Sequence, residues 1–272
     1  MQHHKPEHDF HLVDPSPWPL MGAFSAFVMF IGAVLMIHKV PQGTFIFPAG
    51  LLLVVMTMYV WWRDVVREGF VGHFHTNIVR RGLRLGMALF ILSEVMFFFA
   101  FFFSFFKASI FPVHILDDVW PIKEGIWPPA GIKTFDPWDL PFINTLILLL
   151  SGTSVTWAHH ALLENDRKGL IQGLAWTIVL GISFTCLQAL EYSHAPFHFK
   201  DGIYSSNFFM ATGFHGLHVI IGTLFLIICL IRAIKGQFSP EGHLGFEFAA
   251  WYWHFVDVVW LFLFTFVYVW GS

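Results

Sequence analysis

Long runs of apolar residues, separated by shorter stretches that contain charged residues, proline or glycine, dominate the pattern along this chain. A membrane-spanning helix needs about 20 mostly apolar residues to cross a hydrocarbon layer about 30 Å thick. The runs are continuous rather than alternating, as in FILSEVMFFFAFFFSFF, so the backbone has to satisfy its hydrogen bonds within helices and not in a barrel. The pattern predicts an all-α membrane protein with seven transmembrane helices. They are expected at residues 18–38, 44–62, 83–106, 141–163, 170–192, 204–231 and 248–270.

The lysines and arginines between these runs predict the orientation of the chain. Ten fall on the side that carries the N-terminus and five on the opposite side. Cytoplasmic loops of membrane proteins carry the excess of Lys and Arg. The N-terminus is therefore expected inside and, with seven spans, the C-terminus outside.

The connections between the runs predict four parts of the chain. Residues 1–17 form a polar N-terminal segment, and residues 18–62 a two-helix transmembrane unit. Residues 63–82 are expected to be a basic linker on the inner surface, followed by a five-helix bundle at residues 83–272. The long linker makes a natural seam between the first two helices and the other five.

The composition supports a membrane protein and excludes several other classes. Hydrophobic residues make up 56% of the 272 residues and charged residues 12%, whereas an ordinary soluble domain is about 25% charged. These values exclude a disordered chain and a nucleic-acid-binding protein. Both cysteines, Cys186 and Cys229, lie inside apolar runs, which indicates neither a disulfide framework nor a thiolate metal site.

The 16 histidines raise the question of a haem or metal site. His215 and His218 are three residues apart, and His159 and His160 are adjacent, but a metal centre usually needs three or four converging ligands. Histidines that form hydrogen bonds between packed helices are the favoured interpretation. We expect no metal site and no redox centre in this chain.

Acidic residues inside the apolar runs are candidates for function. Glu94 lies about 17 Å along its predicted helix, near the middle of the membrane, where an ionised carboxylate is costly. It either handles protons or forms a switchable contact, or it is a structural acid bonded to a neighbouring helix. His254 and Asp257 are spaced i, i+3, and for this polar pair a structural role is favoured.

Basic residues next to tryptophans mark the expected inner surface. Arg67 follows the Trp61–Trp62 pair, and Arg232 and Lys235 end the sixth predicted helix. Such residues can bind anionic lipid headgroups, and the alternative is ordinary charge flanking of membrane helices.

Several long segments of this chain resemble cytochrome c oxidase subunit III. Together they touch six of the seven predicted helices and the N-terminal segment. They are HLVDPSPWP at 11–19, WWRDVVREG at 61–69, LSEVMFFFAFF at 92–102, TWAHHALLENDRK at 156–168, ATGFHGLHVIIGTLFL at 211–226 and AAWYWHFVDVVWLFLF at 249–264.

The resemblance implies a fold and a set of partners. Family members have seven helices, with a lipid-filled cleft between the first two and the other five. They are non-redox core subunits of the haem–copper oxidase, in which subunits I and II carry haem a and copper and react with cytochrome c. The resemblance therefore implies subunits I and II as partners, cytochrome c only indirectly, and phospholipids of the phosphatidylglycerol or phosphatidylethanolamine type as bound ligands.

The resemblance also implies roles for individual residues. Glu94 matches the carbodiimide-reactive membrane acid of the family. His8 and His11 match N-terminal histidines that lie near the entrance of a proton path in bacterial members. Six residues match positions that line the cleft or anchor its lipids: Trp62, Arg67, His75, His218, Arg232 and Lys235.

The N-terminal histidines also have an interpretation without the resemblance. His3, His4, His8 and His11 lie on the side expected inside, and imidazole exchanges protons readily near neutral pH. They form either a proton relay to a channel mouth or only a solvated polar tail.

Two other functions and two compartments stay open. A proton channel centred on Glu94 lacks a relay partner on its own helix. Subunit III of a quinol oxidase typically lacks the first two helices, which are present here. The loop between the third and fourth helices resembles bacterial members, whereas the N-terminal segment is also close to organellar ones, so a bacterial plasma membrane is favoured over the mitochondrial inner membrane.

Overall fold

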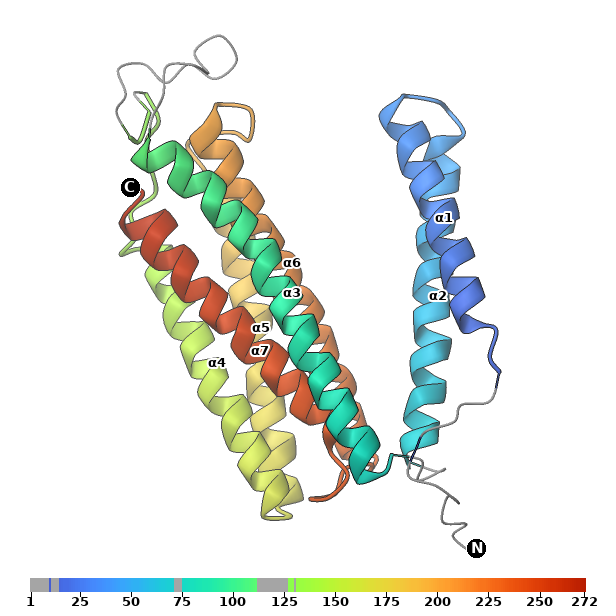
Figure 1. The fold of residues 1–272 in the computed structure, drawn as a ribbon. Coiled ribbons are helices and arrows are strands. Elements are labelled where there is room, and N and C mark those ends of the chain that lie inside the picture. Colours follow the sequence, from blue (N-terminus) through green and yellow to red (C-terminus); the bar gives the residue numbers. More distant parts are fainter. Residues whose placement is uncertain (1–9, 11–14, 71–74, 112–126, 130) are drawn as a thin grey trace, which may run out of the picture. The chain divides into compact units, whose positions relative to one another are not determined.

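Helices dominate the computed structural model, which describes residue 10 and residues 15–70, 75–111, 127–129 and 131–272. Within these residues, seven helices are long and apolar enough to cross a membrane, which confirms the predicted all-α fold with seven spans (Figure 1). A π-helical segment, η3, continues the last one. Their bounds are α1 Trp18–Ile37, α2 Gly43–Phe70, α3 Asn77–Ile110, α4 Leu140–Leu163, α5 Arg167–Ser193, α6 Ile203–Ile234, α7 Leu244–Phe262 and η3 Leu263–Val269.

Most of the helices are longer than the apolar runs that predicted them, whereas α1 ends one residue before its run does. α2 and α3 both extend into residues 63–82, the segment that the sequence assigned to a linker. The reason is physical: hydropathy detects the part of a helix that lies in hydrocarbon, whereas helical hydrogen bonding continues into the polar interface. α3 has 34 residues, which is about 51 Å of helix against a hydrocarbon layer of about 30 Å.

The chain divides into two compact units, residues 1–83 and residues 84–272. In the first unit, α1 and α2 form an antiparallel hairpin with close backbone contact. A Cβ added at Gly32 would lie 2.3 Å from the backbone nitrogen of Phe47, and one at Gly50 would lie 2.4 Å from that of Met29. Small residues at such positions allow membrane helices to approach closely. Glycine at these two positions therefore allows the two backbones to approach closely, where a larger side chain would not fit.

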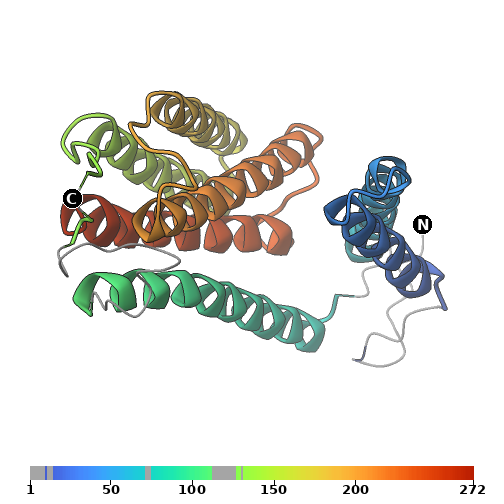
Figure 2. The same cartoon turned by 90° about the horizontal axis from the view of Figure 1, so that it is seen from above.

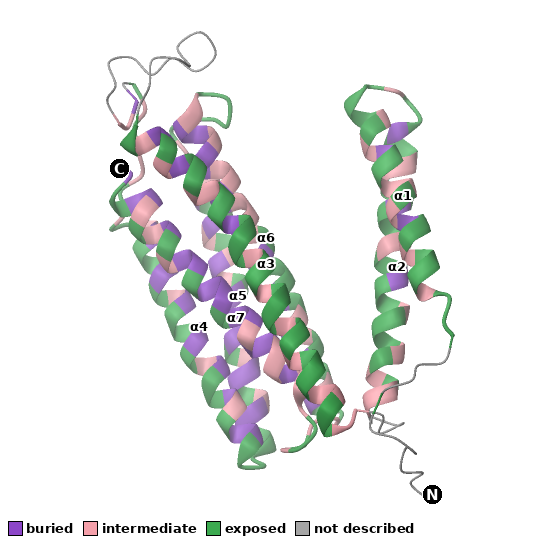
Figure 3. Ribbon diagram, in the orientation of Figure 1, coloured by how far each residue is buried: buried purple, intermediate pink, exposed green. Residues whose placement is uncertain are grey.

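In the second unit, α4, α5, α6 and α7 pack around a shared core, and α3 runs along this group (Figure 2). α7 is the most buried helix, with Trp253 and Trp260 almost completely enclosed. Buried positions concentrate on α4–α7 (Figure 3). The η3 segment keeps Val267 and Tyr268 in the same core.

Candidate functional site

A carboxyl–imidazole pair joins α3 to α6. Glu94 Oε2 and His218 Nε2 are 2.7 Å apart. Each residue lies at the middle of its helix, since α3 spans residues 77–110 and α6 spans residues 203–234. The side chain of Glu94 is 22% exposed and that of His218 is 10% exposed. The acid that the sequence placed near mid-membrane is thus bonded to a neighbouring helix.

The second nitrogen of His218 determines what this pair can do chemically. Nδ1 lies 2.6 Å from the carbonyl oxygen of Phe214, which can only accept a hydrogen bond, so Nδ1 carries a proton. Glu94 then either donates a proton to a neutral imidazole or, as a carboxylate, accepts one from an imidazolium. Both forms carry no net charge. The pair can therefore move one proton between oxygen and nitrogen without placing a net charge in the membrane.

Aromatic rings surround the His218 imidazole. The ring of Phe98 lies edge-on at 4.9 Å between centroids, and Tyr252 stacks at 6.3 Å. Phe97 and Phe255 complete the surroundings at 5.9 and 6.4 Å. The rings come from α3 and α7, so three helices enclose the imidazole and limit the access of water to it.

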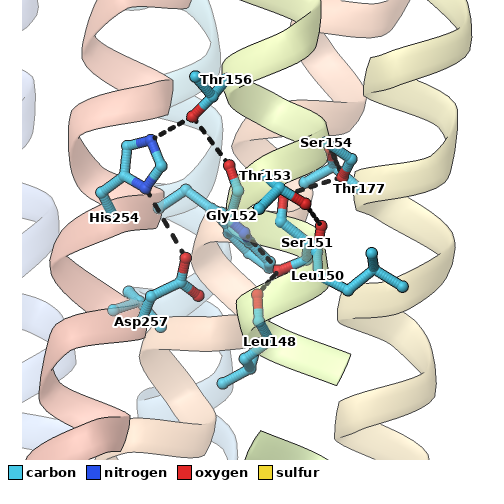
Figure 4. Close-up of polar contacts among 12 residues, drawn as sticks. Leu148, Leu150, Ser151, Gly152, Thr153, Ser154, Thr156, Thr177, His254 and Asp257 are labelled. Carbon is cyan, nitrogen blue, oxygen red and sulfur yellow. Dashed lines mark hydrogen bonds and ion pairs between the residues drawn. The ribbon is translucent and has the colours of Figure 1, made fainter. Parts of the chain in front are cut away.

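A second polar pair lies between α4 and α7 (Figure 4). His254 Nδ1 is 3.8 Å from Asp257 Oδ2, and His254 Nε2 is 3.2 Å from Thr156 Oγ1. The side chain of Asp257 is only 9% exposed, whereas that of His254 is 46% exposed. The predicted i, i+3 partners therefore lie near each other, but one is enclosed and the other faces outward.

Indole groups of α7 donate hydrogen bonds to hydroxyl groups of α4 on both sides of this pair. Trp253 Nε1 donates to Ser151 Oγ and Trp260 Nε1 donates to Thr145 Oγ1, both at 2.9 Å. A Cβ added at Gly152 would lie 2.6 Å from Asp257 Oδ2, so only glycine leaves room for that carboxyl group. The α4–α7 contact thus combines polar bonds with close packing.

Sequence reasoning missed a buried acid at the end of α5. Glu191 Oε1 accepts a hydrogen bond of 2.6 Å from the hydroxyl of Tyr268 and one of 3.2 Å from Gln188 Nε2. All three residues are at most 5% exposed. The position of Glu191 inside an apolar run could have identified it as a candidate buried acid. Its partner Tyr268 could not be found in this way, because it lies 77 residues away.

A bidentate ion pair was also missed. Arg84 Nε and Nη2 donate to the two carboxylate oxygens of Glu247 at 2.9 and 2.8 Å. The pair links the N-terminal part of α3 to the first turn of α7. Arg84 is one of the ten basic residues on the side that is expected inside, and nothing in the local pattern indicates a partner 163 residues away.

Three of the expected lipid-binding residues belong to the first unit. Trp62 and Arg67 are exposed on α2, and His75 precedes α3. His75 lines a pocket of about 330 Å³ that also includes Trp18 and Asp64, whose side chains share a hydrogen bond of 2.9 Å. Trp62 and Arg67 are not among the residues that line this pocket.

The other three lie on α6, but at different depths. Arg232, near the helix end, bonds to Gln237 Oε1 at 3.2 Å and lies over the Phe238 ring at 4.6 Å. Lys235 is exposed at the C-cap. His218 is 14 residues before Arg232, about 21 Å along the helix, and both its nitrogens are engaged. The three do not form one cluster.

The remaining candidates concern metals and the N-terminus. Among the residues that the structure describes, no group of three or more His, Cys, Asp or Glu side chains could hold a metal ion. His215 Nε2 lies 3.1 Å from the Val256 carbonyl oxygen, as expected of a histidine between packed helices. His8 and His11 lie outside the described residues.

Comparisons with known proteins cover almost the whole chain. A sequence model of the family described as Cytochrome c oxidase subunit III matches residues 8–272. A Rickettsia felis protein named Probable cytochrome c oxidase subunit 3 is 63% identical over 267 residues, which cover 97% of this chain and 96% of the relative. Cytochrome c oxidase subunit 3 of Prototheca wickerhamii is 56% identical over 267 residues, with 98% and 99% covered. The similarity therefore includes both units.

Proposed function

The chain belongs to the cytochrome c oxidase subunit III family, and from this premise we propose that it stabilises the catalytic subunit of the oxidase and binds structural phospholipids. It is a multi-pass membrane subunit of cytochrome c oxidase in the respiratory chain, which implies subunits I and II as partners. The family itself lacks redox centres. The observation that carries the proposal is the match over residues 8–272, since both units of the chain take part in it.

Co-purification tests this proposal. A tagged chain isolated from its native membrane in mild detergent should bring down haem a and copper, whereas the chain purified alone should show neither. Removal of the chain should leave an oxidase that turns over but loses activity during use, as the resemblance implies. An equally durable oxidase without the chain would contradict the stabilising role.

For lipid binding, we propose phosphatidylglycerol or phosphatidylethanolamine as the ligand, in the lipid-filled cleft that the family resemblance implies. Support comes from Arg67, which is exposed, and from Arg232, for which the structure gives no acidic partner among the described residues. Each cation near an anionic lipid surface contributes about 1 kcal/mol, or about fivefold in affinity. Both nitrogens of His218 are occupied, so this residue is not a headgroup ligand in the proposal.

Native mass spectrometry of the intact oxidase would test the lipid sites. Arg67→Ala and Arg232→Ala should each lower the number of retained phosphatidylglycerol molecules, and the double variant should lower it further. Arg81→Ala is the matched control, because Arg81 is also exposed near the start of α3 but is not a candidate. If the double variant retains as many lipids as the control, the two arginines are only flanking charges.

Orientation and proton uptake complete the proposal. The excess of Lys and Arg supports an N-terminus inside and a C-terminus outside, which puts His8 and His11 on the side of proton uptake. A bacterial plasma membrane remains the favoured location, and relatives from Rickettsia felis and Prototheca wickerhamii represent bacteria and a eukaryote. Labelling of an added N-terminal tag in sealed vesicles of known sidedness would contradict this orientation if it placed the tag outside.

A proton channel centred on Glu94 is the alternative that a specific observation favours, namely its shared proton with His218. The chain reconstituted alone in vesicles distinguishes the two functions. We expect no proton flux, because aromatic rings surround the His218 imidazole and no further acid or base among the described residues bonds to the pair. Measurable flux that Glu94→Gln abolishes would favour the channel.

A further inference from the structure

An outward-facing polar group lies in the middle of the membrane on the surface formed by α4 and α7. Asp257 is 13 residues after Leu244 and 12 before Val269, which is about 20 and 18 Å from the two ends of this span. His254 lies one turn earlier, with 46% of its side chain exposed. Polar groups at this depth almost always face the interior of a bundle, another protein group or a water-filled cavity.

Some atoms of this polar group that could form hydrogen bonds have no partner within the group. Thr156 Oγ1 donates its hydrogen to the Gly152 carbonyl oxygen at 2.9 Å, so it accepts a hydrogen bond from His254 Nε2. His254 Nδ1 is 3.8 Å from Asp257 Oδ2, which is too long for a hydrogen bond. Asp257 Oδ1 is buried and has no hydrogen-bond partner among the described residues. Lipid tails offer no donor or acceptor for these atoms.

The surface around this group suits a protein helix. We define the α4–α7 surface by five exposed residues, which are Leu149, Thr153, Thr156, His254 and Val258. The α4 members are spaced i, i+4, i+7 and therefore form one stripe. Both threonines bond to carbonyl groups of their own helix, so their small methyl-bearing side chains permit close approach of another backbone.

We propose that the α4–α7 surface docks a transmembrane helix of the catalytic oxidase subunit, and that this helix places a hydroxyl or carboxamide side chain against His254. The proposal rests on the function proposed above. A neutral group that donates a hydrogen bond matches the exposed imidazole of His254, because its Nδ1 can accept one and lies 3.8 Å from Asp257 Oδ2. The helix also covers the apolar flanks of the surface, Leu149 and Val258.

Photocrosslinking in the intact complex tests which molecule covers this surface. Val258→p-benzoylphenylalanine should crosslink to the haem-bearing subunit. Val179→p-benzoylphenylalanine is the matched control, because Val179 is the same residue type, equally exposed at 51%, and lies at the middle of α5. Crosslinks to lipid alone at Val258, or equal protein crosslinks at both positions, would overturn the assignment.

Substitution of His254 tests the hydrogen bond. His254→Leu should lower the haem a retained per tagged chain by about 3- to 18-fold, the range that measured interhelical hydrogen bonds in membranes correspond to. His254→Gln keeps a donor and an acceptor and should restore most of the haem. If the His254→Leu chain retains as much haem a as the wild-type chain, the proposed polar contact is wrong.

The amount of haem a retained per tagged wild-type chain distinguishes a failure of this inference from a failure of the proposed function. If the wild-type chain retains haem a but the Val258 probe finds only lipid, the proposed function stands and the docking surface is wrong. If the wild-type chain retains no haem a under conditions in which the oxidase remains intact, the proposed function fails as well.

Discussion

The Glu94–His218 bond should contribute measurably to the stability of the chain, and a double-mutant cycle isolates that contribution. Glu94→Leu leaves His218 Nε2 without its partner, and His218→Phe leaves the Glu94 carboxyl group unbonded at mid-membrane depth. The double variant removes both polar groups. His218→Phe keeps an aromatic ring beside Phe98 and Tyr252, so the packing around the site changes little.

The structure sets the expected magnitudes. An unsatisfied buried polar group costs about 1–3 kcal/mol, so each single variant should lower the free energy of unfolding by that amount. Replacement of both partners by apolar groups of similar shape is nearly neutral, so the double variant should be less destabilised than the sum of the two. Interhelical hydrogen bonds in membranes couple by about 0.6 kcal/mol on average and about 1.7 kcal/mol at most.

Reversible unfolding of the full chain in mixed micelles, followed by circular dichroism, gives the four free energies. Ser93→Ala is the control, because within the part of the chain that the structure describes Ser93 Oγ bonds only to the Phe90 carbonyl oxygen on its own helix. It should change stability little. If the effects of Glu94→Leu and His218→Phe simply add, the bond contributes nothing and the reasoning from geometry is refuted.

Two further predictions concern packing and proton uptake. Gly152→Ala should lower the free energy of unfolding by up to about 2 kcal/mol, because the cost of about 1–3 kcal/mol for overpacking against Asp257 exceeds the gain of about 1 kcal/mol in helix propensity. Gly216→Ala, whose Cβ meets nothing within 4 Å, should not lower it, and equal stability of the two variants would contradict this. His8→Ala with His11→Ala should slow oxidase turnover above neutral pH and spare it at low pH. Imidazole, with a pKa of about 6.5, contributes most to proton uptake where bulk protons are scarce. Turnover like the wild type at every pH would make the segment a tether.

The sequence predicted the number and kind of helices because apolar runs report directly on the hydrocarbon layer. Their ends were less predictable. Residues 63–70 and 77–82 are helical although they are basic and polar, since an interface tolerates charged side chains on a helix that continues out of the membrane. The π-helical turn at Leu263–Val269 leaves no pattern in the sequence, because it depends on how the end of α7 packs.

The candidate site was predictable by residue but not by partner. Glu94 and the His254–Asp257 pair could be found because charge and imidazole are rare in apolar runs. The His218 partner of Glu94 lies 124 residues away, and no local spacing connects them. The i, i+3 spacing of His254 and Asp257 predicted their proximity, but only the tertiary packing determines that Asp257 is enclosed and His254 is exposed.

The Arg84–Glu247 and Glu94–His218 pairs both lie on α3, a helix that apolar packing holds only weakly. In the most apolar 18-residue stretch of α3, 11% of the residues are buried, whereas 56% are buried in the corresponding stretch of the span that contains α7. Lipid provides no hydrophobic force that would press two apolar helices together. The contacts of α3 lie at several heights, among them the Arg84 ion pair near one end, the Glu94 bond in the middle and the ring contact of Phe105 with Trp127 near the other end. The first two are separated by about 15 Å and the last two by about 17 Å. Specific bonds at intervals fix both the rotation and the depth of α3, which general apolar contact could not do.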